Sequence, residues 1–431
     1  MNTRNALLQA KQETNAEQAY KCGLALQFAL LDDCLRQTEA GTVLADKLQH
    51  QFAPLKHINA QTFVTQGTPF FWMNFCRAID QLTHGTADLS AIDRHVLMTA
   101  FDSYFEYLPL NTRWTLPEGS TLVLPRLGVR VPNSEAFTEL HRVSDRTLIC
   151  SSAQSSILIH LDHISPAFQL PTIEIPESES ARLLLSSDPS LFEQDYRDSI
   201  DLNQPDVASL ATMIGKALTV IQHVAPEIAA SIEQQIHWYV PLHTPEVGVV
   251  HNSHTSSNLN GVIFLSEANN EIDLAEAIIH EFCHTELFIL MDTQDVIHEQ
   301  LGETFYSPWR SDPRPLYGLF HALYVFAEVA NFYAKAEAVC SNLAQLRERR
   351  SEIYYQVKLG LAQVPSDHLA EIGHQIVQAI DADLEYHQQD LNLSTRRLPD
   401  WVDDHLQTWH RENPQLTARF RTLQEPTAML V

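Results

Sequence analysis

Apolar residues recur at helical spacing through much of this chain. Between residues 5 and 50 they lie three and four apart, which predicts a helix with one buried face. A second helical stretch is predicted over 70–107, and more helices are predicted at 207–224, at 316–339 and from there to the end of the chain. The aromatic cluster in the second stretch is interpreted as hydrophobic core: Phe70, Phe71, Trp72 and Phe75.

The pattern changes between residues 113 and 188. Short apolar runs starting at Thr121, Thr147 and Ser156 alternate there with Pro, Gly, Ser and Asp, which is typical of strands. An acidic, polar segment at 187–204 then marks a domain boundary near residue 200. Two more strands are predicted at 236–241 and 261–266, and an exposed edge at the second would let an extended peptide pair with it.

One motif carries strong chemical information. The run His280-Glu281-Phe282-Cys283-His284 is an HExxH sequence inside a predicted helix. Histidines four residues apart project from one helical face, so both imidazoles can bind one divalent cation. Glu281 lies beside them and can act as a general base on a metal-bound water or orient a ligand. Because Cys283 lies to one side of the two histidines, it is interpreted as packing.

Two ligands do not make a specific metal site, and three residues compete for the third position. Glu303 follows His284 at the spacing of one large class of zinc aminopeptidases, but its surroundings are typical of a loop. His321 lies in the next predicted helix among apolar neighbours, where a buried histidine needs a partner. Glu328, seven residues later on the same face, is a further ligand candidate. The sequence pattern does not decide which of the three is the third metal ligand.

The segment between these two helices is unusually stiff. Prolines at 308, 313 and 315 fix φ and push the residues before them toward extended geometry, which holds the guanidinium groups of Arg310 and Arg314 in a rigid frame. Such arginines can bind a carboxylate bidentately. Pairing with Asp312 inside the loop is an equally weighted interpretation.

Composition limits the partners. The 431 residues carry 28 Lys and Arg against 54 Asp and Glu, a formal net charge of −26, which disfavours nucleic acid and anionic membranes. No signal-like or membrane-spanning apolar run is found, and the six cysteines are scattered, so we expect reduced thiols in a cytoplasmic protein.

The HExxH helix, the Pro308-Trp309-Arg310 loop with its Asp-Pro-Arg-Pro continuation, and the following helix with His321 together resemble a known family. They are similar to the HExxH-type peptide β-hydroxylases, which depend on 2-oxoglutarate and iron and modify ribosomally made precursor peptides in natural-product pathways. The resemblance covers about residues 250–335.

The resemblance implies an Fe(II)- and 2-oxoglutarate-dependent dioxygenase that uses O₂ to hydroxylate a side-chain β-carbon of a precursor peptide. His280, His284 and His321 would hold the metal, Arg310 or Arg314 the distal carboxylate of the cosubstrate, and Glu281 would have no hydrolytic role. An all-histidine triad departs from the usual two histidines and one carboxylate, so Glu328 or Glu303 stays open as the third ligand.

Two alternatives come from other classes. A zinc metallopeptidase would use Zn(II), with Glu281 as general base and Glu303 as third ligand. A peptide-binding protein with a structural metal would close the coordination shell with Cys283 or His298.

These patterns predict an α+β fold, mostly helical, with a β-rich middle section and a zincin-like strand-helix metal site. We divide the chain into a helical region at 1–110 and a β-rich region at 111–200 that could bind peptide. A metal-binding catalytic region at 201–345 and a C-terminal helical region at 346–431 follow. The oligomeric state stays undefined.

Overall fold

The computed structural model describes residues 66–83, 89–119, 121–170, 172–173, 181–183, 207–242, 252–298, 302–393 and 399–414, with scattered positions before residue 63. It mixes helices and strands, as the α+β prediction requires. The helix expected over 5–50 and the boundary expected near residue 200 lie outside the described residues. None of the described helices is both long and apolar enough to cross a membrane.

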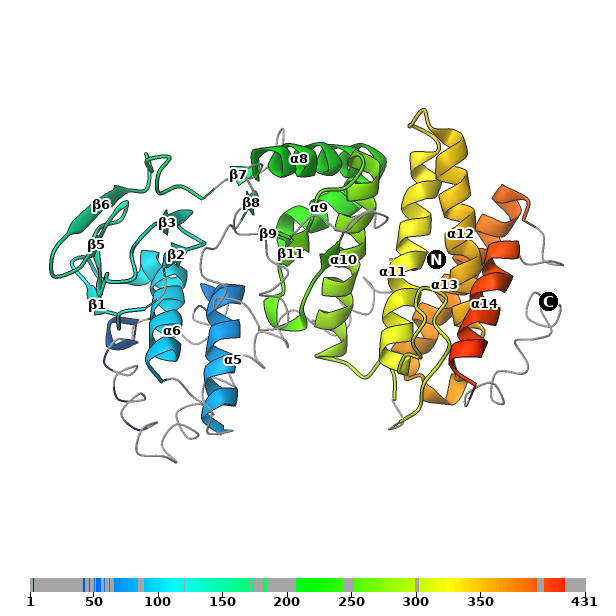
Figure 1. The fold of residues 1–431 in the computed structure, drawn as a ribbon, viewed down its shortest axis with the longest axis horizontal. Coiled ribbons are helices and arrows are strands. Elements are labelled where there is room, and N and C mark those ends of the chain that lie inside the picture. The colour runs from blue at the N-terminus through cyan, green and yellow to red at the C-terminus, as the bar shows by residue number, and fades with distance from the viewer. Residues whose placement is uncertain are drawn as a thin grey trace. The chain divides into compact units, whose positions relative to one another are not determined.

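The chain divides into two compact units (Figure 1). One unit comprises 1–17, 220–230 and 275–431, and the other comprises 18–219 and 231–274. Helices α8 (Val207–Val224), α9 (Pro226–Gln235) and α10 (Glu271–Met291) each contribute residues to both units.

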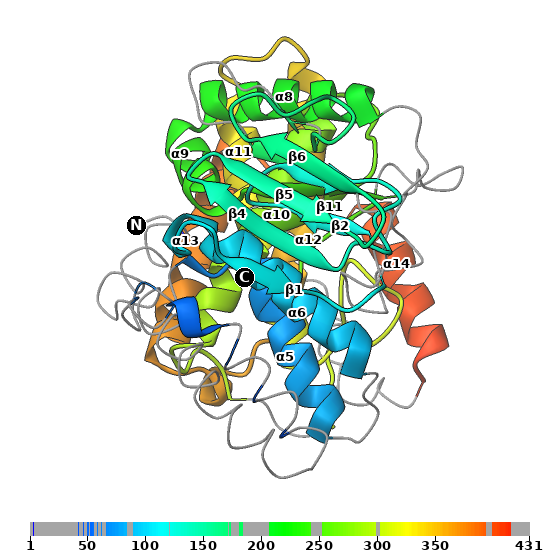
Figure 2. The ribbon, with the colours of Figure 1, turned by 90° about the vertical axis from the view of Figure 1, so that its left-hand side faces the viewer.

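The second unit contains the described strands. Its antiparallel four-stranded sheet has the order β1-β4-β5-β6 and faces the viewer in Figure 2. The strands are β1 (Arg113–Thr115), β4 (Glu139–Ser144), β5 (Thr147–Ser151) and β6 (Ser156–His160). A separate hairpin pairs β2 (Leu122–Leu124) with β3 (Val129–Val131). The turn of this hairpin is fixed by the buried carboxylate of Asp102, which accepts hydrogen bonds from the backbone N–H groups of Arg126 and Leu127.

A mixed five-stranded sheet completes this unit, in the order β10-β11-β9-β8-β7. Its strands are β7 (Thr172–Ile173), β8 (Ala181–Leu183), β9 (Trp238–Pro241), β10 (Ser253–His254) and β11 (Val262–Leu265). All four residues of β11 are buried, and β11 pairs with β9 on one side and β10 on the other. The expectation of an exposed edge at 261–266 is therefore wrong, since both edges of this strand already carry ladder hydrogen bonds.

The predicted helical stretch at 70–107 consists of two helices, α5 (Pro69–Thr83) and α6 (Leu89–Tyr104). Its aromatic cluster is core, as expected, because the side chains of Phe70, Phe71 and Phe75 are fully buried and Trp72 is nearly so. Edge-to-face contacts link Phe70 to Trp238 and Phe71 to Tyr104. Burial of this aromatic surface stabilises the unit.

Where the structure describes the first unit, it consists of helices and the loops between them. Helices α11 (Leu316–Ala336), α12 (Leu343–Leu361) and α13 (Glu371–Leu391) pack side by side, and α14 (Asp400–Glu412) follows them (Figure 1). Helix α10 begins where the side chain of Asn270 accepts hydrogen bonds from the N–H groups of Ile272 and Asp273. The strand-then-helix order predicted for the HExxH segment is present, with β11 preceding α10.

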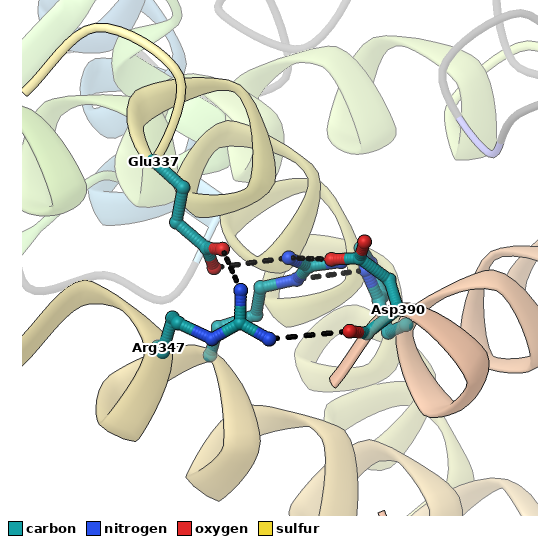
Figure 3. A network of polar contacts seen from close by, with 5 residues as sticks. Glu337, Arg347 and Asp390 are labelled. Carbon is teal, nitrogen blue, oxygen red and sulfur yellow. Dashed lines mark hydrogen bonds and ion pairs between the residues drawn. The ribbon is translucent and has the colours of Figure 1, made fainter. Parts of the chain in front are cut away.

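A buried ion-pair network ties α12 to α13 and to the end of α11 (Figure 3). Arg350 is buried and donates through Nη1 to Glu337 at 2.9 Å and to Asp390 at 2.8 Å. Its Nε donates to Nδ1 of the buried His387 at 3.0 Å. Arg347 adds a more exposed ion pair to Glu337. The network thus links three helices through charged side chains.

Candidate functional site

Three histidines meet between α10 and α11. His280 and His284 lie one turn apart on α10, and His321 lies on α11. Nε2 of His284 is 3.2 Å from Nε2 of His280, while Nδ1 of His284 is 3.0 Å from Nδ1 of His321. The two helices therefore bring together the three imidazoles that the sequence singled out.

The nitrogens are only partly arranged for a metal ion. Two imidazoles bound to one tetrahedral ion at ~2.0–2.1 Å have their nitrogens about 3.3 Å apart, so the His280–His284 spacing fits a shared ion. His284, however, faces His280 and His321 with opposite ring nitrogens, so the three donors do not converge on one point. Accordingly, within the described residues no group of three or more His, Cys, Asp or Glu side chains is arranged to hold a metal.

The donor chemistry nevertheless suits a divalent transition metal. The Nε2 atom of His321 is buried and has no hydrogen-bond partner in the described part of the chain, a costly state for a polar atom. Burial and the neighbouring His280 lower the pKa of His284 well below its usual value, and burial and His284 do the same to His321. Both imidazoles are therefore neutral at pH 7, which is the form that binds metals.

Aromatic side chains surround the histidines. The Phe326 ring meets the His280 ring edge to face, with the ring centroids 4.9 Å apart. The Trp309 indole stacks on the Phe326 ring at a centroid distance of 4.9 Å and an interplanar angle of 4°. The rings of Phe288 and Tyr317 both lie against the His321 ring, with centroid distances of 4.8 and 4.4 Å. Such rings shield the imidazoles from part of the solvent and lower the local dielectric constant.

The loop before α11 is anchored at both ends. Phe305 and Arg314 exchange backbone hydrogen bonds of 2.7 and 2.9 Å, which close the loop like a short hairpin. Tyr306 is buried, and its hydroxyl lies 2.8 Å from Nδ1 of His405 on α14. Asn413, just after α14, donates to the carbonyl of Ser311 at 3.1 Å. The loop is thus held by helix α14 as well as by its prolines.

Both arginines of this loop pair with Asp312. Arg310 donates through Nε to Oδ1 at 3.0 Å, and Arg314 donates through Nη1 to Oδ2 at 3.1 Å. The hydrogen bond from Arg310 is the largest effect and lowers the pKa of Asp312; burial opposes it, and the hydrogen bond from Arg314 adds to the lowering. The pairing inside the loop that the sequence allowed is present, and two guanidinium groups against one carboxylate leave a local charge of +1.

The carboxylates considered as metal ligands lie in other settings. Oε2 of Glu303 is 3.2 Å from Nδ1 of the buried His368, so its contact is with the segment before α13. Glu328 is buried and lies 3.5 Å from the amide nitrogen of Asn331. Glu281 and Cys283 are buried on α10.

Several residues at this site escaped the sequence reasoning. Phe288 follows His284 by four residues, and Tyr317 precedes His321 by four, so helical spacing alone places both beside the imidazoles. The stack of Trp309 on Phe326 joins a loop to a helix and has no local sequence signal. His405 and Asn413, which hold the loop, are about a hundred residues away in sequence.

No protein-family model matches the chain, and a search of curated proteins finds no significantly similar sequence.

Proposed function

We propose that this protein is an Fe(II)- and 2-oxoglutarate-dependent dioxygenase that hydroxylates a side-chain β-carbon of a ribosomally made precursor peptide in the cytoplasm. The observation that carries the proposal is the continuous cluster of His280, His284 and His321, with the arginine loop packed on α11 through the stack of Trp309 on Phe326. The bound iron would supply O₂ activation coupled to oxidative decarboxylation of 2-oxoglutarate.

The chain's own residues would bind, orient and exclude water. The three imidazoles would hold the metal and leave open positions for ligands. Arg310 or Arg314 would bind the carboxylate of 2-oxoglutarate that lies away from the metal. Phe288, Phe326 and Trp309 would keep water from the reacting atoms.

The zinc peptidase interpretation finds less support in these contacts. It needs Glu303 as a ligand beside the HExxH histidines, whereas the carboxylate of Glu303 pairs with His368. It also leaves the Arg–Asp–Arg loop without a role in the chemical step.

Anaerobic titration of the Fe(II)-loaded protein with 2-oxoglutarate tests the proposal. We expect a visible metal-to-ligand absorption band from a bidentate complex, and we expect its loss in His280→Ala. His374→Ala, a change of the same kind at a histidine on α13, should keep the band. A peptidase would show no band, would retain Zn(II) tightly, and would lose peptide cleavage on Glu281→Gln.

A further inference from the structure

The two outer strands of the four-stranded sheet differ in how they are protected. Strand β6 forms one edge of this sheet and β1 forms the other (Figure 2). Strand β1 is only three residues long, and Arg113 on it forms an ion pair with Glu139 on β4. Short length and charge both discourage pairing with another chain. Strand β6 is five residues long and contains no Lys, Arg, Asp, Glu or Pro, so it lacks these protections.

The outer side of β6 presents backbone groups that can form a further ladder. Residues opposite each other in an antiparallel pair alternate between hydrogen-bonded and non-hydrogen-bonded pairs. The N–H of Leu161 donates to the carbonyl of Arg146 on the neighbouring side at 2.8 Å, which fixes the alternation along β5 and β6. Every second residue of β6 therefore directs its N–H and C=O groups away from β5. These residues are Ser156, Leu158 and His160.

The side chains of the same residues are exposed. Leu158 is 53% exposed, and Ser156 and His160 are exposed as well. Leu158 lies opposite the half-buried Ile149 of β5, so the two side chains share the solvent face of the sheet. Leu158 thus extends an apolar row to the outer edge of the sheet.

This edge is complementary to itself. If two copies of β6 pair antiparallel about a two-fold axis at Leu158, this residue faces its own copy in a hydrogen-bonded pair. Ser156 then faces the partner's His160, and the three outward residues of each strand are all used. Like charges placed directly opposite each other would destabilise a sheet, and this register places none there. A chain with a formal net charge of −26 can therefore meet a second copy along a neutral strip.

Pairing at this edge also ends at two copies. The two four-stranded sheets would join into one sheet of eight strands, whose outer strands are the short, charged β1 of each copy. A two-fold contact of this kind is closed, whereas a head-to-tail contact between different edges would continue into a filament. Pairing with a second copy would thus remove the unprotected edge of each sheet.

We infer that the protein forms a two-fold symmetric dimer through antiparallel pairing of β6 with β6 of a second copy, centred on Leu158. The inference does not depend on the proposed function. Strand β6 belongs to the unit formed by 18–219 and 231–274, and the three histidines belong to the other unit.

Sedimentation equilibrium of the full chain in 0.15 M KCl, at about 1 to 100 µM protein, is the first test. We expect a monomer–dimer equilibrium in the wild type. Leu158→Lys should weaken it about tenfold or more, because two like charges then face each other across the axis. Leu110→Lys is the matched control, since Leu110 is 55% exposed and lies outside β6. It changes the net charge equally and should weaken the dimer less than about threefold.

Mixing two variants separates specific pairing from damage to the fold. Leu158→Glu should also be mostly monomeric, again because of like charges at the axis. When it is mixed with Leu158→Lys, the lysine of one copy faces the glutamate of the other. We expect the mixed dimer to be about fivefold or more tighter than either variant alone, measured with a fluorescent label on one variant. A variant that had failed to fold would not be rescued in this way.

Hydrogen exchange gives an independent measurement on the wild type. The N–H groups of Ser156 and Leu158 should exchange more slowly as protein concentration rises, and those of Leu158→Lys should not change. A monomeric wild type would overturn the inference, and protection at all concentrations would mean that another segment of the chain covers the edge. A dimer weakened equally by Leu158→Lys and Leu110→Lys, or a mixture without rescue, would also overturn the pairing at Leu158.

Discussion

At the scale of single residues, the histidine cluster was within reach of sequence reasoning. Two histidines four apart on a helix must share a face, and His321 was selected because a buried imidazole among apolar neighbours needs a partner. The orientation of the rings is not within reach of the sequence, because it depends on contacts between helices, such as that of Phe326 on α11 with His280 on α10.

The metal ligands give the first prediction. His321→Gln should lower the affinity of the protein for Co(II), a spectroscopic stand-in for Fe(II), by at least about tenfold, because loss of a metal contact costs on this order even for supporting residues. Glu303→Gln, at a residue that contacts His368, should change the affinity less than about threefold. Competition with a chromophoric chelator measures both. The reverse order would point to the Glu303 site of the peptidase interpretation.

His387 gives a second residue-scale prediction, which concerns pH. Burial, and then the charge of Arg350 against the weaker opposite effect of Asp390, lower the pKa of His387 to about 3. The unfolded chain binds the proton near pH 6.5 and the folded protein does not, so stability present above pH 6.5 is lost as pH falls toward 3. The expected slope from this group approaches about 1.4 kcal/mol per pH unit.

Urea unfolding at several pH values measures this slope. His387→Gln cannot titrate, and its amide oxygen can still accept the hydrogen bond from Nε of Arg350. The variant should therefore show a shallower loss of stability between pH 6.5 and 4 than the wild type. Equal slopes would mean that His387 is protonated in the folded protein.

At the scale of elements, the ion-pair network shows what pattern reasoning misses. The helices α11, α12 and α13 follow from apolar spacing, but the partners of Arg350 lie on other helices, at Glu337 and Asp390. No periodicity links these positions. The prediction of one helical stretch at 70–107 likewise missed the division into α5 and α6.

We expect substitutions at Glu337 and Arg347 in this network to lower the free energy of unfolding by unequal amounts. Glu337→Gln should lower the free energy of unfolding by about 3 kcal/mol, since the buried Arg350 then loses its most buried carboxylate partner. Arg347→Gln should cost less than about 1 kcal/mol, because this side chain is 41% exposed. Chemical denaturation at neutral pH compares the two. Similar costs would show that Arg350 is not dependent on Glu337.

The anchoring of the arginine loop by α14 gives another element-scale prediction. Tyr306→Phe keeps the ring against Trp409 and removes the hydroxyl that meets His405, so it should cost about 1 kcal/mol of unfolding free energy. Tyr317→Phe, at a tyrosine 38% exposed, serves as the control and should cost less. An equal cost for both would indicate that the Tyr306–His405 contact adds no net stability.

At the scale of the whole molecule, the compact units of the structure are not continuous stretches of sequence. Sequence reasoning cuts the chain into successive regions, whereas the unit that holds the histidines is assembled from 1–17, 220–230 and 275–431. Composition changes along the chain cannot reveal such a division, because three helices contribute residues to both units. Net charge, in contrast, is a property of the whole chain and is readable from sequence.

That charge conflicts with the proposed cosubstrate, because a formal net charge of −26 repels a dianion. The Arg310–Asp312–Arg314 group contributes a local charge of only +1, and its attraction for the ligand is strong only at short distances. Added salt shortens the Debye length from about 30 Å at 0.01 M to about 8 Å at 0.15 M, so it screens the distant acidic groups before the local arginines. We therefore expect the association rate constant of 2-oxoglutarate to rise with KCl over this range.

Stopped-flow mixing of the Fe(II)-loaded protein with ligand measures this rate, and 2-oxobutyrate is the matched control because it carries half the charge. Its rate should rise with about half the slope in log units, since the repulsion scales with ligand charge. A 2-oxoglutarate rate that falls with salt would mean that the local field of the two arginines, and not the net charge, controls the approach of the ligand. The acidic surface would then influence the binding of peptide rather than of cosubstrate.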